Sequence, residues 1–376
     1  MARLSYAQIQ LITNIVNQFE IDEGTIDIIE LFGAGRINQT FKITLRNGEK
    51  RIEYLLQNVN HFVFPNTKEL MENLTMVTEY IRQHGGRSVQ YIKCKKTTKM
   101  INGPYIYIDN TMNHRHWRMY NYIDADVYPC IINPHHAYKL GEAIASFYKS
   151  LDGFDTHQLR DTIPDFHNTP KRFEALAVSG LLDSVNDVNR MADVKEEIKF
   201  VVERRDKLGI IMDALEKGEI PYRVCHNDPK LSNVLFDKQK NTPICMIDLD
   251  TIMPGSCLFD VGDAIRSIAN MASEDDKTTE NVSLSVELYE EFVKGYLDGM
   301  GDKLIDKEKK LIPMAVWVIT MELGIRFLKD HIDRNVYFKI ERDGENLERA
   351  RIQFALAKDI ERKIQEGKLN KILDVH

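Results

Sequence analysis

Residues 222–250 read YRVCHNDPKLSNVLFDKQKNTPICMIDLD. The apolar runs YRVC, NVLF and ICMIDL predict short strands, and the polar segments between them predict a loop and a turn. His226, Asp228 and Asn233 follow the first run in the pattern H-x-D-x-x-x-x-N, and Asp248 lies 15 residues after Asn233, inside the last run. Strands in this order are expected to bring the four polar side chains together at one strand end.

This set of side chains suits phosphoryl transfer. One carboxylate accepts the proton of the attacking hydroxyl, while an amide oxygen and a second carboxylate hold the magnesium that bridges the ATP phosphates. Magnesium prefers oxygen ligands and needs few from the protein, so one Asn and one Asp suffice. The alternative is a buried polar turn in which Asp228 and Asn233 only cap backbone groups. Three matched roles at a suitable spacing favour the catalytic interpretation.

The pattern resembles the catalytic loop and metal aspartate of the protein-kinase-like superfamily, in its aminoglycoside phosphotransferase and choline kinase branch. In that branch the metal aspartate lies in I-D-x-[DE], which is I-D-L-D at residues 247–250 here. The resemblance implies that Asp228 is the catalytic base and that Asn233 and Asp248 bind Mg²⁺. It implies that His226 supports the loop.

The resemblance also implies an α+β, protein-kinase-like bilobal fold. The N-terminal lobe, residues 1–121, would hold a small antiparallel sheet that covers the nucleotide, one main helix and an N-terminal packing helix. The C-terminal lobe, residues 122–376, would be mostly helical and carry the catalytic loop with the metal and substrate sites. A chain of 376 residues is long enough for two cores. Asp260, at the start of a helix, resembles the aspartate that ties down the catalytic loop, so we expect structural support rather than catalysis from it.

Composition narrows the class of protein. The formal charge is −7, and Lys and Arg are scattered rather than clustered, so nothing indicates a nucleic-acid partner. The five cysteines show no C-x-x-C pair, which argues against a disulfide framework or zinc site and fits a reducing cytosol. No apolar run approaches the ~18 residues that a membrane helix needs. We therefore expect a cytoplasmic protein with no membrane association and no obligate protein partner.

Periodicity and capping signals predict the remaining elements. A capping box at Ser5 and Gln8 begins the first helix. Asn133, with a proline after it, begins another, and a box at Asp193 and Glu196 begins a third that ends at Gly218. The predicted helices are 5–20, 67–84, one from 134, 193–218, 313–330 and 345–366. The further predicted strands are 25–32, 39–45 and 51–58, followed by a strand meander over residues 88–123.

The glycines Gly33 and Gly35 lie in a turn between predicted antiparallel strands. No helix or third glycine follows, as a dinucleotide fingerprint requires, and G-x-x-x-x-G-K-[ST] is absent from the chain. Taken alone, the turn is equally an ordinary hairpin or a phosphate-covering loop. Its position upstream of the catalytic stretch, in the order that kinases use, favours nucleotide binding.

The next strand departs from the family pattern. Kinases of this superfamily place a lysine there to hold the α- and β-phosphates, whereas the aligned residue here is Gln57. Glutamine donates a hydrogen bond but supplies no charge, and Arg36 or Arg51 is the candidate that compensates. Glu72, in the following helix, matches the glutamate that usually pairs with the lysine. With Gln57 opposite, no salt bridge forms, so a solvated Glu72 is the alternative.

The segment WRMYNYID, residues 117–124, is expected to connect the lobes. In the family this hinge offers backbone groups to adenine, which implies contacts from Tyr122 and Ile123. The alternative is a plain edge strand.

Several segments narrow the resemblance to the N-acetylhexosamine 1-kinase group, over most of residues 25–340. They include LLQNVNHFVFPNTKELMENL, IPDFHNTPKRF, IDLDTIMPGSCLFDVGDAIR and MELGIRFLKDHIDRNVYFKI. In that group an arginine in G-I-R-F-L and a tyrosine in the following Y-F contact the sugar together with the catalytic aspartate. These map to Arg326, Tyr337 and Asp228.

Two of the residues in these segments have competing interpretations. Glu322 and Asp330 lie four residues before and after Arg326 and are positioned to pair with it on a helix. His167, in IPDFHNTPKRF, is either a substrate contact or a surface or capping histidine.

The implied reaction moves the γ-phosphoryl of ATP to the anomeric hydroxyl of N-acetylglucosamine or N-acetylgalactosamine, with Mg²⁺ as cofactor. Two alternatives stay open. One is a kinase of another small molecule, such as an aminoglycoside, choline or homoserine. The other is a nucleotide-binding pseudokinase, which only Gln57 suggests.

Overall fold

The computed structural model describes residues 4–33, 37–95, 103–109, 114–186 and 192–375. The chain forms two compact units. Unit 1 comprises Met1–Asp126 and Gly153–Ile163, and unit 2 comprises Val127–Asp152 and Pro164–His376. The lobe boundary between residues 121 and 122 stays a prediction.

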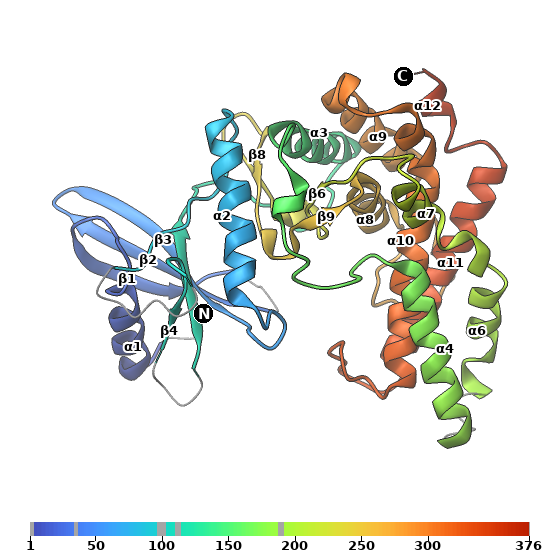
Figure 1. Cartoon of the computed structure of the whole chain (residues 1–376), viewed down its shortest axis with the longest axis horizontal. Helices are drawn as coiled ribbons and strands as arrows, with labels where there is room; N and C mark the ends of the chain where they lie inside the picture. Colours follow the sequence, from blue (N-terminus) through green and yellow to red (C-terminus); the bar gives the residue numbers. More distant parts are fainter. Residues whose placement is uncertain (1–3, 34–36, 96–102, 110–113, 187–191, 376) are drawn as a thin grey trace. The chain divides into compact units, whose positions relative to one another are not determined.

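Unit 1 is built on an antiparallel five-stranded sheet in the order β1-β2-β3-β5-β4 (Figure 1). Gly48, with φ of 59°, lies in the two-residue turn between β2 and β3, where glycine tolerates the left-handed conformation. Two of the strand pairings decide the site geometry below, those of β2 with β3 and of β3 with β5. The strands are β1 Thr25–Leu31, β2 Gln39–Asn47, β3 Lys50–Val59, β4 Tyr107–Ile108 and β5 His116–Asn121.

One face of this sheet packs against helix α1, Tyr6–Val16. The predicted capping box at Ser5 and Gln8 is present and begins the helix. Side chains alternate along a strand, so every second residue joins this core. The core includes Ile12, Val16, Phe41, Ile43, Leu45, Leu56, Trp117 and Met119.

The second helix of unit 1 is α2, Thr67–Gln83, with the predicted apolar stripe buried. The α2 residue Asn73 is fully buried and exchanges two hydrogen bonds with the backbone of Arg160, at 2.8 and 2.9 Å. Since Arg160 lies in the returning segment Gly153–Ile163, this pair fixes the segment to unit 1.

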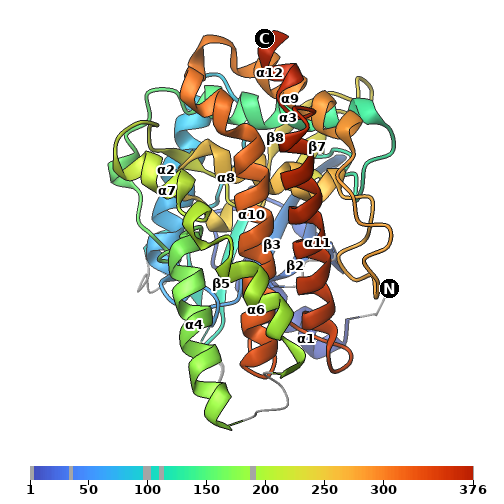
Figure 2. The same cartoon turned by 90° about the vertical axis from the view of Figure 1, so that its right-hand side faces the viewer.

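Unit 2 is mostly helical, and its central element is the buried helix α10. Helices α4, α8 and α11 pack against α10, and Figure 2 shows α4 and α11 running alongside it. α3 and α9 cross so closely that a Cβ added at Gly295 would lie 2.1 Å from the carbonyl oxygen of Tyr138. The helices are α3 Pro134–Ser150, α4 Thr169–Asn186, α6 Lys195–Val202, α7 Ile210–Glu216, α8 Cys257–Ala269, α9 Val286–Met300, α10 Asp306–Ile332, α11 Glu345–Gln365 and α12 Lys371–Val375.

Two helix predictions need correction. The helix predicted at 193–218 is divided into α6 and α7, and its N-cap is Val194 without a side-chain cap, so the Asp193 box is wrong. Gly209, a poor helix former, is the N-cap of α7, so the continuous helix is interrupted before this residue. The helix predicted at 313–330 begins earlier, at Asp306, with Pro313 inside it. α10 is long and apolar enough to cross a membrane, but 83% of its most apolar window is buried inside the protein, as in a core helix.

Four short strands of unit 2 hold the stretch that opened the sequence analysis. β6 Arg223–Cys225 pairs with β9 Met253–Gly255, and β7 Val234–Phe236 pairs with β8 Pro243–Met246. β6, β7 and β8 are the three predicted strands. The predicted α+β class, with an antiparallel-sheet N-terminal part and a helical C-terminal part, is confirmed.

Candidate active site

The catalytic loop, residues 226–233, lies between β6 and β7 and ends in a single 3₁₀ turn. Asp248 lies just beyond β8 in a left-handed backbone conformation, with φ of 60°. The backbone amide of Ile247 donates to the carbonyl oxygen of Asn233 at 2.9 Å. The two segments that carry Asn233 and Asp248 are therefore joined directly, as the strand order predicts.

Asp228 contacts two neighbours through one carboxylate oxygen. The Lys230 ammonium lies 2.9 Å from Oδ2, and the Asn233 amide nitrogen lies 3.3 Å from Oδ2 and 2.8 Å from the Asp228 carbonyl oxygen. Burial lowers the pKa of Lys230, but the Asp228 carboxylate outweighs burial and raises that pKa above its ordinary value. Among the described residues nothing hydrogen-bonds to Oδ1, and the side chain is 30% exposed. One oxygen of Asp228 is thus fixed and the other is available to a ligand.

His226 is fully buried and connects the catalytic loop to the Asp248 segment. Its Nε2 lies 2.9 Å from the carbonyl oxygen of Ile247, and its Nδ1 lies 3.3 Å from the backbone amide of Asp228. A carbonyl only accepts and an amide N–H only donates, so these contacts assign a neutral ring protonated on Nε2. His226 therefore joins Asp228 to the residue that precedes Asp248.

Asp260, in the first turn of α8, holds the start of the same loop. Its carboxylate accepts from the backbone amides of His226 at 2.8 Å and Asn227 at 2.7 Å, and from the Tyr148 hydroxyl at 2.5 Å. Burial raises the pKa of the Asp260 carboxyl, and the hydrogen bonds from Tyr148 and the two backbone amides oppose that rise. Asn227 has φ of 64°, and these bonds hold its amide in place.

A second polar group lies on α10 and the loop before α4. The Glu322 carboxylate accepts from Thr169 at 2.8 Å and lies 2.9 Å from Nδ1 of His167, and all three side chains are buried. Burial raises the pKa of Glu322, but His167 and its hydrogen bond outweigh burial and hold that pKa below its ordinary value. Nε2 of His167 is buried and has no hydrogen-bond partner among the described residues.

Arg326, one helical turn along α10 from Glu322, lies among aromatic rings rather than acids. Its guanidinium carbon is 5.5–5.7 Å from the ring centroids of Phe166, Tyr337 and Phe338. Asp330 instead accepts from the backbone amides of Tyr337 at 2.7 Å and Phe338 at 2.9 Å. In the described part of the chain neither Glu322 nor Asp330 forms an ion pair with Arg326. The structure brings Arg326 and Tyr337 together.

The ring of His167 packs against Phe259 of α8, with 5.1 Å between ring centroids, and the next residue, Asp260, holds the start of the loop. Burial raises the pKa of the Asp263 carboxyl, but Arg266, His167 and Lys230 outweigh burial and bring the pKa below its ordinary value. We call the residues His167, Thr169, Arg172, Glu322, Arg326 and Tyr337 the acceptor cluster.

The predicted nucleotide residues lie in unit 1. Gly33 follows β1 with φ of 74°, and Gly35 lies outside the described residues. Tyr122 and Ile123 come directly after β5 and are half-buried. The backbone amide of Tyr122 donates to the carbonyl oxygen of Glu53 at 3.1 Å, so this donor is already used within unit 1.

Gln57, on β3, contacts two side chains on the neighbouring strands. Its Oε1 accepts from Nε of Arg118 at 2.9 Å and from the terminal nitrogen of Arg118 at 2.5 Å, and its amide nitrogen donates to Thr40 at 3.0 Å. Arg51 is exposed at the start of β3, Arg36 lies outside the described residues, and Glu72 is exposed beside Lys68. Neither Glu72 nor Arg51 reaches Gln57.

A sequence model of the phosphotransferase enzyme family matches residues 28–302. The chain belongs to this family. Among solved structures, the choline kinase of Cryptosporidium parvum Iowa II is 17% identical, with 96% of this chain and 98% of that chain covered and a TM-score of 0.58. The aminoglycoside phosphotransferase of Alicyclobacillus acidocaldarius is 13% identical, with 99% and 97% covered and a TM-score of 0.59. Plasmodium vivax ethanolamine kinase is 15% identical, with 96% and 88% covered and a TM-score of 0.56. These likenesses show a shared fold.

Magnesium, which phosphotransferases typically use, fits the donors in the loop. The Asn233 amide nitrogen is engaged by Asp228, which leaves its oxygen for a cation, and Asp248 adds a carboxylate on the adjoining segment. Both are the oxygen ligands that Mg²⁺ prefers. The described residues hold no cluster of three or more His, Cys, Asp or Glu side chains placed to bind a metal. Phosphates and water would therefore complete the coordination.

Sequence reasoning did not single out three cations that lie near predicted site residues. Lys230 stands inside the H-x-D-x-x-x-x-N motif, so its position two residues after Asp228 was a usable signal. Arg118 lies in WRMYN, where a charged residue in an otherwise apolar strand indicates a buried role. Arg172 lies in the KRF of IPDFHNTPKRF, and only its spatial proximity to Arg326 shows that it belongs to the acceptor cluster.

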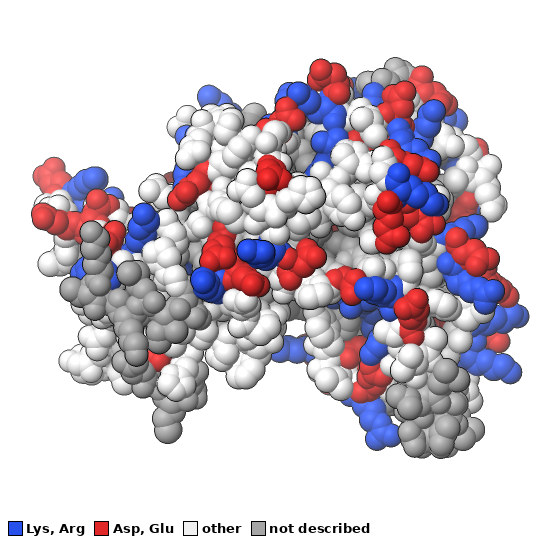
Figure 3. Space-filling model, viewed as in Figure 1, with Lys and Arg blue, Asp and Glu red and all other residues white. Residues whose placement is uncertain are grey.

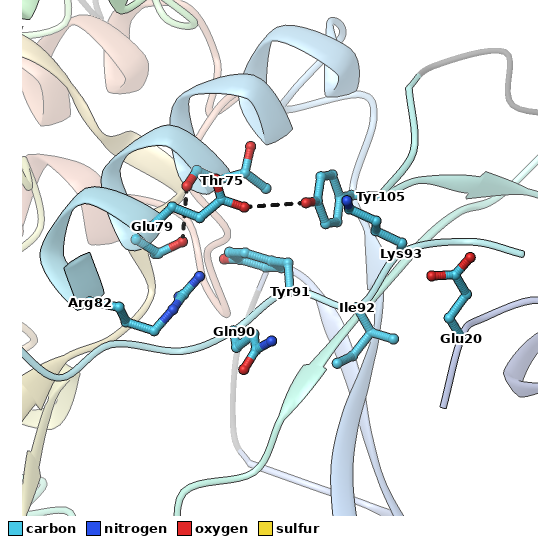
Figure 4. A pocket seen from close by; sticks show the side chains of 10 residues that line it. Glu20, Thr75, Glu79, Arg82, Gln90, Tyr91, Ile92, Lys93 and Tyr105 are labelled. Atoms are coloured by element: carbon cyan, nitrogen blue, oxygen red, sulfur yellow. Dashed lines mark hydrogen bonds between the residues drawn. The ribbon is translucent and has the colours of Figure 1, made fainter. Parts of the chain in front are cut away.

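The surface charge is mixed, and a cavity in unit 1 lies beside Arg118, whose guanidinium carbon is 5.8 Å from the ring centroid of the cavity-lining Tyr91. Acids and bases are intermixed on the face that Figure 3 shows, without a broad patch of one sign. A cavity of about 290 Å³ in unit 1 is lined by Glu79 and Arg82 of α2, by Tyr105 and by residues 90–93, among others (Figure 4). None of the predicted nucleotide residues lines this cavity.

Proposed function

We propose that this phosphotransferase is an ATP-dependent, Mg²⁺-dependent sugar 1-kinase that phosphorylates the anomeric hydroxyl of an N-acetylhexosamine. The observation that carries the proposal is the acceptor cluster, in which His167 packs against Phe259 of α8, the residue before the loop anchor Asp260. Family membership supports the phosphoryl transfer. The resemblance of the segments around Arg326 and Tyr337 to the N-acetylhexosamine 1-kinases supports the acceptor.

In this reaction the free oxygen of Asp228 accepts the proton of the sugar hydroxyl. The hydroxyl oxygen forms a bond to the γ-phosphorus, and the bond from that phosphorus to the β,γ-bridging oxygen breaks to release ADP. Lys230 fixes the other oxygen of Asp228 and supplies positive charge next to the reaction. Asn233 and Asp248 would hold Mg²⁺, which would offset the negative charge of the transferring phosphoryl group.

His226 and Asp260 are proposed to support this geometry. His226 keeps the Asp228 backbone and the Asp248 segment at a fixed separation, while Asp260 anchors the two residues that precede Asp228. A base held by a rigid loop meets the acceptor hydroxyl in one orientation, which lowers the entropic cost of reaching the transition state.

For the nucleotide, we propose that Gly33 and Gly35 cover the phosphates with backbone groups. Tyr122 and Ile123 are proposed to contact adenine. Because the Tyr122 amide already donates to Glu53, its carbonyl oxygen and the amide of Ile123 are the groups assigned to the base.

The chemistry of the acceptor cluster suits a neutral, polyhydroxylated acceptor. Arg326, Arg172 and the Tyr337 hydroxyl all offer donors, while Nδ1 of His167 faces the Glu322 carboxylate. An acetamido carbonyl and several ring hydroxyls are acceptors for such donors. We assign Arg326 and Tyr337 to direct sugar contacts.

The same cluster disfavours a cationic acceptor. Quaternary ammonium ligands are bound on the faces of aromatic rings. Here the guanidinium of Arg326 already lies over Phe166, Tyr337 and Phe338. The Arg326 charge, second only to burial, lowers the pKa of Arg172, so a second cation lies close by. Choline or an aminoglycoside would meet repulsion from both arginines.

The test is ADP release with Mg²⁺-ATP against N-acetylglucosamine, N-acetylgalactosamine, glucose, choline and kanamycin. Asp228→Asn serves as the blank, since loss of a general base typically costs ~10²–10⁴-fold in rate. The proposal expects turnover confined to the N-acetylhexosamines and a product without a reducing end. Turnover on choline or kanamycin alone would keep the kinase and overturn the acceptor. Absence of turnover throughout, with Mg²⁺-ADP still bound, would favour the pseudokinase.

A further inference from the structure

Three side chains form a row across the sheet of unit 1. Thr40 on β2 is directly opposite Gln57 on β3, and Gln57 is directly opposite Arg118 on β5. Directly opposed residues on adjacent strands point to the same face of a sheet. Arg118 is 2% exposed and Gln57 8%, while Thr40 is half-buried. The row therefore leads from a buried cation to a more accessible hydroxyl.

The hydrogen bonds of this row fix the orientation of the Gln57 amide. A guanidinium has donors only, so the Gln57 atom that contacts both Nε and a terminal nitrogen of Arg118 has to be the oxygen. The amide nitrogen then points away from Arg118, toward Thr40. It carries two hydrogens, and within the described residues only Thr40 accepts from it. One N–H of a rigidly oriented amide is left to donate.

The position of this amide matches a functional need. Kinases hold the α- and β-phosphates with a lysine on the third strand, below a glycine turn. Gln57 is on β3, and Thr40 lies at the start of β2, shortly after the Gly33–Gly35 turn. Among the described residues, the cation that contacts Gln57 is Arg118.

We infer that Arg118 and Gln57 together replace the phosphate-holding lysine: Gln57 donates its amide hydrogen to a nucleotide phosphate, and Arg118 positions and polarises it. Arg118 is a positioning residue, because it acts through Gln57. Its positive charge, buried where screening by water is weak, makes the amide a stronger donor to an anion. This inference rests on the proposed nucleotide site and deepens it.

Gln57→Glu is the discriminating variant. The glutamate carboxylate has nearly the same shape and forms an ion pair with Arg118, so unit 1 is expected to keep its stability. A carboxylate has no N–H, however, and adds a negative charge next to the phosphates. We expect affinity for Mg²⁺-ADP to fall by about tenfold or more, since a hydrogen bond to a charged group is lost. Affinity for adenosine, which has no phosphate, is expected to stay unchanged.

Arg118→Met and the double variant Arg118→Met/Gln57→Lys complete the test. The single change frees the amide to rotate and removes the cation, so Mg²⁺-ADP affinity falls. The double change places an ammonium where other kinases have one, and affinity is expected to return toward the wild-type value. If Arg118 were merely structural, the introduced ammonium would give no rescue, and adenosine binding would fall as much as ADP binding.

The measurements are calorimetric titrations of the full chain with Mg²⁺-ADP and with adenosine, together with melting temperatures. Unchanged Mg²⁺-ADP affinity in Gln57→Glu overturns the inference, as does an equal loss for ADP and adenosine. A wild-type chain that binds neither ligand overturns the proposed function itself. The two failures are therefore distinguishable without any acceptor substrate.

Discussion

Replacing Asp260 by alanine is the perturbation that tests how the catalytic loop is held. The carboxylate accepts from the amides of His226 and Asn227 and from the Tyr148 hydroxyl, at 2.5–2.8 Å, in a fully buried environment. Alanine leaves these three donors without an acceptor. Each unsatisfied buried donor costs roughly 1–3 kcal/mol, so even at the lower end the free energy of unfolding falls by ~3 kcal/mol. That is a large share of the ~5–15 kcal/mol that stabilises a typical domain.

Two further variants remove only part of the hydrogen bonding to Asp260 and should therefore destabilise the protein less. Asp260→Asn retains an accepting oxygen but turns an NH₂ group toward one of the donors, so we expect a loss of ~1.5–3 kcal/mol, in the range of a charged hydrogen bond. Tyr148→Phe removes one donor and leaves both amide bonds, so a loss of ~1 kcal/mol is expected. The loss of unfolding free energy should therefore be largest in Asp260→Ala, smaller in Asp260→Asn and smallest in Tyr148→Phe.

The assays are denaturant unfolding and native-state hydrogen exchange. Exchange reports on the amides of His226 and Asn227 directly, since their protection depends on the bonds to Asp260. Turnover should fall along with protection, because the loop positions Asp228. If Asp260→Ala destabilises no more than Tyr148→Phe and leaves both amides protected, the loop is held by something else and the reasoning fails.

The remaining predictions concern the metal, the helix crossing and acid stability. Asp248→Asn should reduce turnover by at least ~10²-fold and raise the Mg²⁺ concentration needed for half-maximal rate, and an unchanged Mg²⁺ titration would refute the ligand assignment. Gly295→Ala should lower unfolding free energy by ~1–3 kcal/mol or more, because its Cβ overlaps the Tyr138 carbonyl; the exposed Lys294→Ala on the same helix is the control. The pKa of Glu322 is below its ordinary value of 4.5 in the folded chain. Its stabilising contribution is therefore present above the unfolded pKa and lost as pH falls through the lower folded value. The free energy of unfolding of the wild type should exceed that of Glu322→Gln near neutral pH, and this difference should shrink below about pH 4.5 in denaturant titrations. A difference that does not change with pH would contradict the prediction.

The catalytic stretch was predictable because its signals are local. Strands β6, β7 and β8, the loop between them and the segment after β8 follow from apolar runs and polar breaks in residues 222–250. Capping chemistry likewise located the start of α1 and of α3, where Ser5 and Asn133 accept from the first turn. In both cases the forces that define the element act between residues close together in the chain.

The contacts that tertiary structure creates were not predictable. The break between α6 and α7 and the early start of α10 depend on packing that overrides the periodic pattern. Glu322 and Asp330 lie at helical spacing from Arg326, so the sequence permits ion pairs with both. Only the structure shows that Asp330 instead accepts hydrogen bonds from the backbone amides of Tyr337 and Phe338. The roles of the site residues stay predictions until the variants are measured.

Gln57 shows how a departure from a family pattern acquires meaning. On sequence alone it permits a pseudokinase, because a neutral residue replaces a cation. In the folded chain the cation is present one strand away, 61 residues later, and two of its nitrogens donate to the Gln57 oxygen. Long-range pairing of β3 with β5 places it there, so no local motif could reveal it. A missing lysine is therefore weak grounds for assigning inactivity when the neighbouring strand supplies a buried arginine.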